Sequence, residues 1–184
     1  GIFHERSRWS EHEISSLSFG YNIAVTTTQI ARMYATIANG GIKRPLSVVK
    51  NMSDDIEPER VISEEVANDV LNMLETVTNK GGTAYKARVP GYRVGGKTGT
   101  SKKAFAGSYG EEYVNIFAGI APISDPQIAV VVLINEPGGD FYHAGDTAAT
   151  VFSKIVADTM QMLNVPPDAM NVDAVLERKL HAAR

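Results

Sequence analysis

Cysteine is absent from this 184-residue chain. Disulfide bonds, thiolate nucleophiles and zinc sites built on cysteine are therefore excluded for this sequence. Histidine is scarce, and no two histidines have the His-Glu-x-x-His spacing or lie four residues apart, so we expect no metal site. The histidines are His4, His12, His143 and His181.

Long apolar runs and an excess of positive charge are also missing. No run of about 18 apolar residues occurs, so the sequence predicts no transmembrane helix, and residues 1–6 do not resemble a signal peptide. The formal net charge is −3, which gives no electrostatic reason to expect nucleic acid as a partner. The hydrophobic content of 43% and the charged content of 21% are ordinary for one globular domain with a core.

The stretch richest in chemical groups is Val94–Ser101, which reads VGGKTGTS. Lys97 supplies a positive charge with three donors, and Thr98 and Thr100 supply hydroxyls. The glycines have no Cβ, so we expect the backbone of another molecule to approach closely here. In an extended strand Lys97 and Gly99 face one side and the two threonines the other. The segment predicts a strand edge that binds a carboxylate or orients a proton donor; a glycine-rich strand with an exposed lysine is the alternative.

Three helices are indicated around this strand. Thr26 and Gln29 have capping-box spacing, and Asn39-Gly40-Gly41 ends the first helix. Ser63 caps a second helix that ends by Gly81-Gly82, and a third spans about residues 146–163. The apolar spacing predicts the following core residues: Ile30, Met33, Tyr34 and Ile37; Val66, Val70, Met73, Leu74 and Val77; Val151, Phe152, Ile155, Val156 and Met160.

The other elements are extended. Residues 42–52 are expected to be extended, and residues 114–123 and 128–135 form two strands joined by a turn at 124–127. With the Lys97 segment they make three consecutive antiparallel strands. The sequence therefore predicts an α+β fold in which helices flank an antiparallel sheet. We expect residues 1–167 to belong to one domain and residues 168–184 to form a peripheral tail.

Four short segments of the sequence resemble one family. They are Ser18-Phe19-Gly20-Tyr21, Arg44-Pro45-Leu46-Ser47, Lys97-Thr98-Gly99-Thr100 and Phe117-Ala118-Gly119-Ile120-Ala121-Pro122. In this order they resemble the C-terminal part of the transpeptidase domain of class B penicillin-binding proteins, of the kind that builds the division septum. Lys-Thr-Gly is the third motif of penicillin-binding proteins and serine β-lactamases. The resemblance implies a five-stranded antiparallel sheet with helices on both faces, of which this chain holds the later part.

The family's other two motifs, Ser-x-x-Lys and Ser-x-Asn, precede Lys-Thr-Gly. No Ser-x-Asn occurs in this sequence, and the single Ser-x-x-Lys joins Ser47 to Lys50. These two residues lie in a segment predicted to be extended, where positions three apart face opposite sides. A nucleophile's lysine should instead lie one helical turn away. We therefore do not assign Ser47 as the nucleophile, and we expect the remainder of the domain to supply both motifs and this chain alone to be inactive.

The resemblance implies a cofactor-free peptidoglycan D,D-transpeptidase of cell division. Such an enzyme acylates its serine with a D-Ala-D-Ala stem peptide and is inhibited by β-lactam antibiotics. By resemblance, Lys97 would orient the proton relay, Thr98 and Thr100 would bind the substrate carboxylate, and the N–H of Thr100, next to Gly99, would be half of the oxyanion hole. Division proteins would be its partners, at the periplasmic face of the bacterial inner membrane.

Aromatic residues after the strand are further candidates. Tyr113 and Tyr142, together with Phe141, are expected to line the mouth of the pocket where relatives have aromatic residues, although packing beneath the loop explains them equally well. Two readings of the whole chain stay open beside septal transpeptidase. One is a non-catalytic scaffold or partner-binding module, and the other is an elongation-type transpeptidase or a serine β-lactamase. Motifs preceding Gly1 would discriminate enzyme from scaffold.

Overall fold

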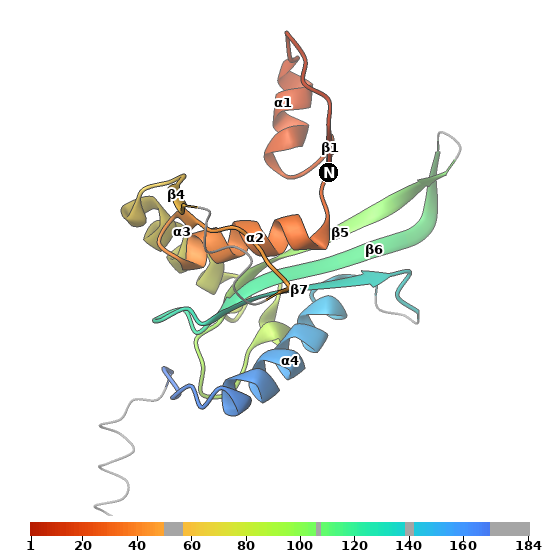
Figure 1. The fold of residues 1–184 in the computed structure, drawn as a ribbon. Coiled ribbons are helices and arrows are strands. Elements are labelled where there is room, and N and C mark those ends of the chain that lie inside the picture. The colour runs from red at the N-terminus through yellow and green to blue at the C-terminus, as the bar shows by residue number, and fades with distance from the viewer. Residues whose placement is uncertain (50–56, 106–107, 139–141, 170–184) are drawn as a thin grey trace, which may run out of the picture.

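The structure is a computed structural model that describes residues 1–49, 57–105, 108–138 and 142–169. Its centre is a three-stranded antiparallel sheet in the order β5-β6-β7, with helices on both faces (Figure 1). The strands are β5 (Gly95–Phe105), β6 (Ser108–Ala121) and β7 (Ile128–Asn135). Helices α2 (Thr27–Ala38) and α3 (Glu64–Thr76) cover one face, and α4 (Ala148–Met162) covers the other. The predicted α+β class and the three consecutive antiparallel strands are confirmed.

The register of the sheet sets which residues share a face. Gly95 lies opposite Ile120, and Lys102 lies opposite Tyr113, before an irregularity between positions 102 and 104. Strand β6 pairs with β7 from Val114 to Ala121. Strand β6 begins at residue 108, earlier than the predicted residue 114, so β5 and β6 form the long hairpin that extends from the sheet in Figure 1.

Alternation along β6 divides the apolar side chains between two cores. On the α4 face, Phe117 meets Phe152 edge-on with ring centroids 4.8 Å apart. Val156 and Met160 are also fully buried in this core. On the α2–α3 face the core is formed by Tyr34, Leu71, Ala118, Ile120 and Ile123.

Helix α2 begins where the sequence indicated. The Thr26 side chain accepts a hydrogen bond from the N–H of Gln29, and the Gln29 side chain accepts one from the N–H of Thr26. Gly40 and Gly41 end the helix with φ of 61° and 85°, values that glycine adopts without steric cost. Helix α3 is capped by Ser63 as predicted, but it ends at Thr76, and turns lead from there to Gly82.

The helices bury narrower faces than their apolar patterns suggested. Met33 of α2 is 53% exposed, and Met73 of α3 is 65% exposed. Successive residues lie about 100° apart around the helix axis, and the sheet contacts each helix on one side only. Apolar side chains at the margin of the apolar face therefore point away from the sheet. The prediction of burial is wrong for Met33, Val66, Met73, Val151 and Ile155.

The side chain of Tyr34 is buried between α2 and the sheet. Burial raises the pKa of its phenol to about 12. The unfolded chain ionises this group near pH 10. Below pH 10 the phenol is neutral in both the folded and the unfolded chain, so the free energy of unfolding keeps its full value. As the pH rises through about 12, the free energy of unfolding falls by about 2–3 kcal/mol in total. Urea unfolding of wild type and Tyr34→Phe at pH 9 and pH 12 should show this extra loss in wild type only. Parallel pH dependence of the two proteins would contradict the assignment.

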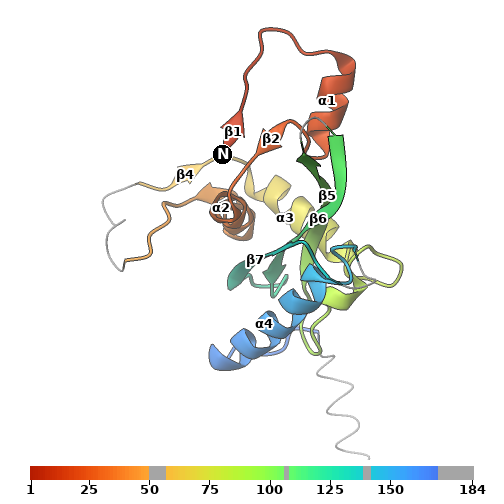
Figure 2. The same cartoon turned by 90° about the vertical axis from the view of Figure 1, so that its right-hand side faces the viewer.

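The N-terminal segment projects away from the sheet (Figures 1 and 2). It contains β1 (Ile2–Phe3), paired with β2 (Ile23–Ala24), and helix α1 (Glu11–Ser18). Helix α1 was not predicted, although Ser10 and Glu13 form a capping box. A second small pair joins β3 (Ile42–Lys43) to β4 (Glu59–Arg60), so the strand expected over 42–52 is limited to two residues, and positions 50–52 lie outside the described residues.

The C-terminal segment is anchored beside the sheet at Asp168. The carboxylate of Asp168 accepts hydrogen bonds from the N–H of Arg93 and the hydroxyl of Ser124, at 2.7 and 2.6 Å. The expected tail falls almost wholly outside the described residues and stays a prediction. Within the described ranges no helix has the length and apolar character needed to cross a bilayer.

Candidate functional site

The Lys97–Thr100 segment lies on β5, at the edge of the three-stranded sheet. Two of its neighbouring glycines serve the protein's own packing. A Cβ on Gly96 would lie 2.4 Å from the carbonyl oxygen of Ala118, and a Cβ on Gly95 would lie 2.8 Å from the backbone of α3. A Cβ on Gly99 would lie 2.6 Å from the Cγ2 of Ile116. The expectation that the glycines admit another molecule's backbone is therefore wrong, because the chain itself fills the space at all three.

The predicted alternation of the motif is confirmed by the register. Lys97 and Gly99 lie opposite Ala118 and Ile116. Residues directly opposite in an antiparallel pair share a face, and Ala118 belongs to the core beneath α2. Lys97 and Gly99 therefore lie on the α2–α3 face of the sheet.

Thr98 and Thr100 lie on the other face, opposite Phe117 and Asn115. Both threonine hydroxyls already have protein partners. The Oγ1 of Thr98 lies 3.2 Å from the Oγ1 of Thr83, and the Oγ1 of Thr100 accepts a hydrogen bond of 3.1 Å from the N–H of Ala144. Each hydroxyl keeps capacity for a further bond, because a hydroxyl has one donor and two acceptor lone pairs.

Lys97 is exposed, and its ammonium group turns back along the strand. Its Nζ donates a hydrogen bond of 3.0 Å to the carbonyl oxygen of Thr98. Within the part of the chain that the structure describes, no ion pair includes Lys97. The charge is thus held at the strand and is available to a ligand or to another polar group.

The two tyrosines proposed from the sequence come together near the end of the motif. Tyr113 and Tyr142 have ring centroids 5.2 Å apart, and the ring of His143 lies 4.1 Å from that of Tyr142. The Nζ of Lys102 lies 5.5 Å from the Tyr113 ring, within reach of a cation–π contact. Tyr142 is 47% exposed, so this row of rings is open to solvent on at least one side. Phe141 lies outside the described residues.

Of the single Ser-x-x-Lys of the sequence, the structure describes Ser47, which lies outside any helix or strand. The Ser47 hydroxyl donates to the carbonyl of Val49, in a turn outside any helix or strand. Lys50 lies outside the described residues.

Two residues beside the motif were not found from the sequence. Thr83 lies in a loop 15 positions before its partner Thr98, and no sequence pattern links the two. Asn115 is fully buried opposite Thr100, and its amide donates to the hydroxyl of Thr147, 2.8 Å away. Its Oδ1 has no hydrogen-bond partner among the described atoms. An asparagine in an apolar strand was the one available signal.

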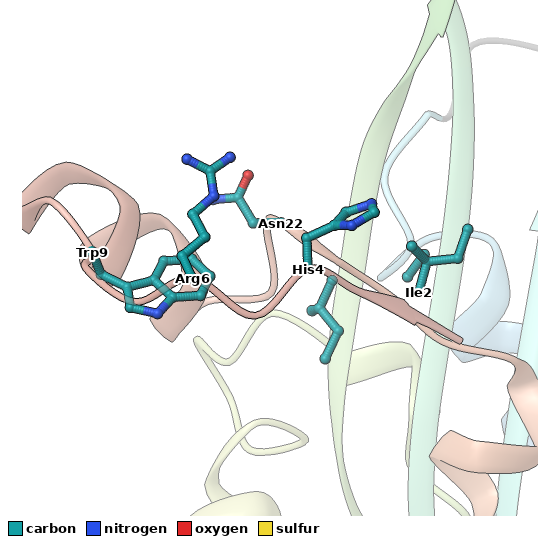
Figure 3. Close-up of a pocket in the computed structure, with 7 residues that line it drawn as sticks. Ile2, His4, Arg6, Trp9 and Asn22 are labelled. Atoms are coloured by element: carbon teal, nitrogen blue, oxygen red, sulfur yellow. The ribbon is translucent and has the colours of Figure 1, made fainter.

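Two pockets formed by the described residues lie away from this motif. A pocket of about 340 Å³ at the N-terminal hairpin is lined by Ile2, His4, Arg6, Trp9, Asn22, Ile23 and Ala24 (Figure 3). Another of about 370 Å³ lies between α2 and the β3–β4 pair. Neither brings together groups for nucleophilic or acid–base chemistry, so we place the site at β5 on the chemistry of its residues. No cluster of three His, Asp or Glu side chains suited to a metal occurs in the described ranges.

Comparison with known proteins gives consistent matches. The family model described as the penicillin binding protein transpeptidase domain matches residues 3–157. The peptidoglycan D,D-transpeptidase FtsI of Escherichia coli (strain K12) is 42% identical over 171 residues, which are 92% of this chain and 29% of that protein. The probable peptidoglycan D,D-transpeptidase PenA of Neisseria gonorrhoeae is 34% identical over 170 residues, 91% of this chain and 29% of that protein.

Solved structures show the same similarity. The transpeptidase domain of penicillin-binding protein 3 from Burkholderia pseudomallei, in its apo form, matches with a TM-score of 0.79 and 41% identity, over 88% of this chain and 50% of that one. A Burkholderia ambifaria structure titled as a peptidoglycan glycosyltransferase matches with a TM-score of 0.80 and 38% identity, over 91% and 50%. The chain thus spans less than a third of these curated relatives and half of these solved chains.

Proposed function

The chain belongs to the family of penicillin-binding protein transpeptidase domains, and from this we propose that it is the Lys-Thr-Gly portion of a peptidoglycan D,D-transpeptidase of cell division. The observation that carries the proposal is the placement of Lys97, Thr98 and Thr100 on a strand at the sheet edge. A charge, two hydroxyls with protein partners and a strand edge that no described strand covers meet there, which is the chemistry that recognises the end of a peptide.

The proposed reaction is acyl transfer through a serine that this chain does not supply. The serine oxygen attacks the carbonyl carbon of the penultimate D-Ala and loses its proton to a base. The tetrahedral oxyanion accepts a hydrogen bond from the N–H of Thr100. When it collapses, the C–N bond breaks and the terminal D-Ala leaves as the amine, with a proton. An amine of a second strand then attacks the acyl-serine ester, forms the cross-link and restores the serine hydroxyl.

Each side chain of the motif has a role in this scheme. Lys97 raises the positive potential and orients the hydroxyl that relays the proton. Thr98 and Thr100 donate to the terminal carboxylate of the stem peptide, or to the acid group of a β-lactam that mimics it. Charge-assisted bonds of this kind are about twice as strong as neutral ones, so the carboxylate fixes the scissile bond in place. Gly99 is proposed to act through its backbone only, since a Cβ there would lie 2.6 Å from the Cγ2 of Ile116.

Tyr113 and Tyr142 are proposed as one wall of the binding site. Their rings are in contact at the end of the motif where Thr100 lies, and the Tyr142 side chain is exposed while Tyr113 is half-buried. Aromatic faces bury large apolar area with little loss of side-chain entropy. The wall would contact the substituent of a stem peptide or drug on the side away from its carboxylate.

The remainder of the transpeptidase domain is the first partner that the proposal requires. Strand β7 has no strand on its outer side within the described residues, and apolar side chains are exposed on β7 and α4, with Leu133 47% exposed and Ile155 42% exposed. Open strand edges and apolar patches of this kind are usually covered. We propose that further strands and helices of the domain cover them and bring the Ser-x-x-Lys and Ser-x-Asn motifs to β5. Residues 1–167 would be part of this domain, and residues 168–184 a tail.

Division proteins and a position at the periplasmic face of the bacterial inner membrane belong to the same proposal. The FtsI name of relatives at 42% identity supports the division type over an elongation-type enzyme or a serine β-lactamase.

A fluorescent penicillin tests the function directly. The protein that contains this chain and the rest of its transpeptidase domain should form one covalent adduct, on a serine outside this chain, and this chain alone should stay unlabelled. Peptide mapping of the labelled protein locates the adduct. A complete domain that forms no adduct would favour the non-catalytic scaffold, and an adduct on Ser47 would show that its exclusion was wrong.

A further inference from the structure

Two loops, far apart in the sequence, hold the hydroxyls of the motif on the α4 face of β5. Thr83, in the loop after α3, reaches the hydroxyl of Thr98. Ala144, in the loop before α4, donates its N–H to the hydroxyl of Thr100. The two loops also contact each other, because a Cβ on Gly145 would lie 2.1 Å from the carbonyl oxygen of Thr83. Only a glycine fits at this contact.

The position of Thr83 is fixed by its neighbours and not by its own side chain. The N–H of Ala84 donates to the carbonyl of Val77 at 3.0 Å, and the N–H of Gly82 donates to that of Asn79 at 2.9 Å. Ala84 is fully buried. Beyond it, Lys86 forms an ion pair of 2.9 Å with Asp146 in the other loop. The backbone of Thr83 is therefore held on both sides, while its exposed hydroxyl is directed at Thr98.

The direction of the Thr83–Thr98 hydrogen bond decides what Thr98 can do. A hydroxyl has one proton, so if Thr98 donates to Thr83 it has no proton left for an anion. If Thr83 donates, the proton of Thr98 is free, and accepting a bond strengthens the bond that Thr98 donates. A carboxylate arriving at β5 selects the second arrangement.

We propose that Thr83 is a positioning residue, whose hydroxyl donates to Thr98 and so directs the proton of Thr98 at the carboxylate of the acyl donor. The proposal rests on the proposed function, in which Thr98 contacts that carboxylate. Thr83 itself touches no reacting atom. Its contribution is to hold the hydroxyl oxygen of Thr98 in place before the ligand arrives, which removes part of the cost of ordering that side chain on binding.

The test uses the complete transpeptidase domain and its acylation by penicillin. Thr83→Val keeps the shape of the side chain and removes the hydroxyl, and it should lower the second-order acylation rate constant about threefold to tenfold. Thr83→Ser keeps the hydroxyl and should retain most of the rate. Thr159→Val is the matched control: its hydroxyl bonds to the carbonyl of Ile155 within α4, and we expect no change.

A double mutant separates positioning from a general structural effect. If Thr83 acts through Thr98, removing its hydroxyl in a Thr98→Val background should cause no further loss. Equal losses in Thr83→Val and Thr83→Ser, additive losses in the double mutant, or a wild-type rate in Thr83→Val would each overturn the proposal. Failure of the proposed function has a different signature, because the wild-type domain would then not be acylated at all. That result would also overturn the role of Thr83.

Discussion

Lys97→Ala is expected to lower the acylation of the complete domain by penicillin about 10²–10³-fold, within the range of effects that positioned proton-transfer groups have on rate. The loss should fall mainly on the acylation step, because the lysine acts on the proton relay and on the potential at the reacting carbonyl. The side chain is exposed, and its ammonium group donates to the carbonyl of Thr98 on its own strand. Stability should therefore change by no more than about 0.5 kcal/mol.

Lys103→Ala is the matched control for this experiment. Lys103 lies on the same strand and pairs with Glu136 near the far end of the hairpin, away from the two threonines of the motif. Stopped-flow or gel-based acylation kinetics, with thermal unfolding in parallel, would measure both variants. Equal rates for Lys97→Ala and wild type, at unchanged stability, would remove Lys97 from the site.

Most of the sheet could be predicted from the sequence because its signals are local. The turn at 124–127 separates two β-rich runs, and period-two alternation then places Lys97 and Thr98 on opposite faces. The register confirms both. The start of α2 was equally local, since Thr26 and Gln29 bond to each other across one helical turn.

The contacts that support the site could not be predicted, because they depend on tertiary approach. Nothing in the sequence shows that Thr83 lies against Thr98, or that Gly145 meets the carbonyl of Thr83. The roles of Gly95 and Gly96 were misjudged for the same reason. A missing Cβ has the same appearance in a sequence whether a ligand or the protein's own backbone takes the space.

Two kinds of residue around the motif therefore have different experimental signatures. Lys97 is exposed and contributes to rate with little effect on stability. Phe152 is expected to contribute to stability with little effect on rate. It packs on Phe117, which lies opposite Thr98 on the strand pair. Measuring both the acylation rate and the free energy of unfolding of the Lys97 and Phe152 variants separates a role in the chemistry from a role in packing.

Phe152→Ala is expected to cost about 3–5 kcal/mol of the free energy of unfolding, the usual range for a buried phenylalanine. The ring is fully buried, and its Cζ and Cε2 atoms lie 2.7 and 2.8 Å from where a Cβ on Gly119 would be. The ring therefore fills the space over a glycine, and with α4 on one side and the sheet on the other, the surroundings have little freedom to close the cavity. Urea unfolding of the complete protein, followed by circular dichroism, measures the loss.

Phe152→Leu restores most of the apolar volume and should recover more than half of that loss. Lys154→Ala, an exposed position on the same helix, is the control and should change the free energy of unfolding by no more than about 0.5 kcal/mol. The folded fraction of Phe152→Ala should still be acylated at close to the wild-type rate, because the ring packs on Phe117 and has no part in the proposed chemistry. A loss below about 1 kcal/mol would mean that α4 does not pack on β6 as described, and a selective loss of rate would place the ring in the site.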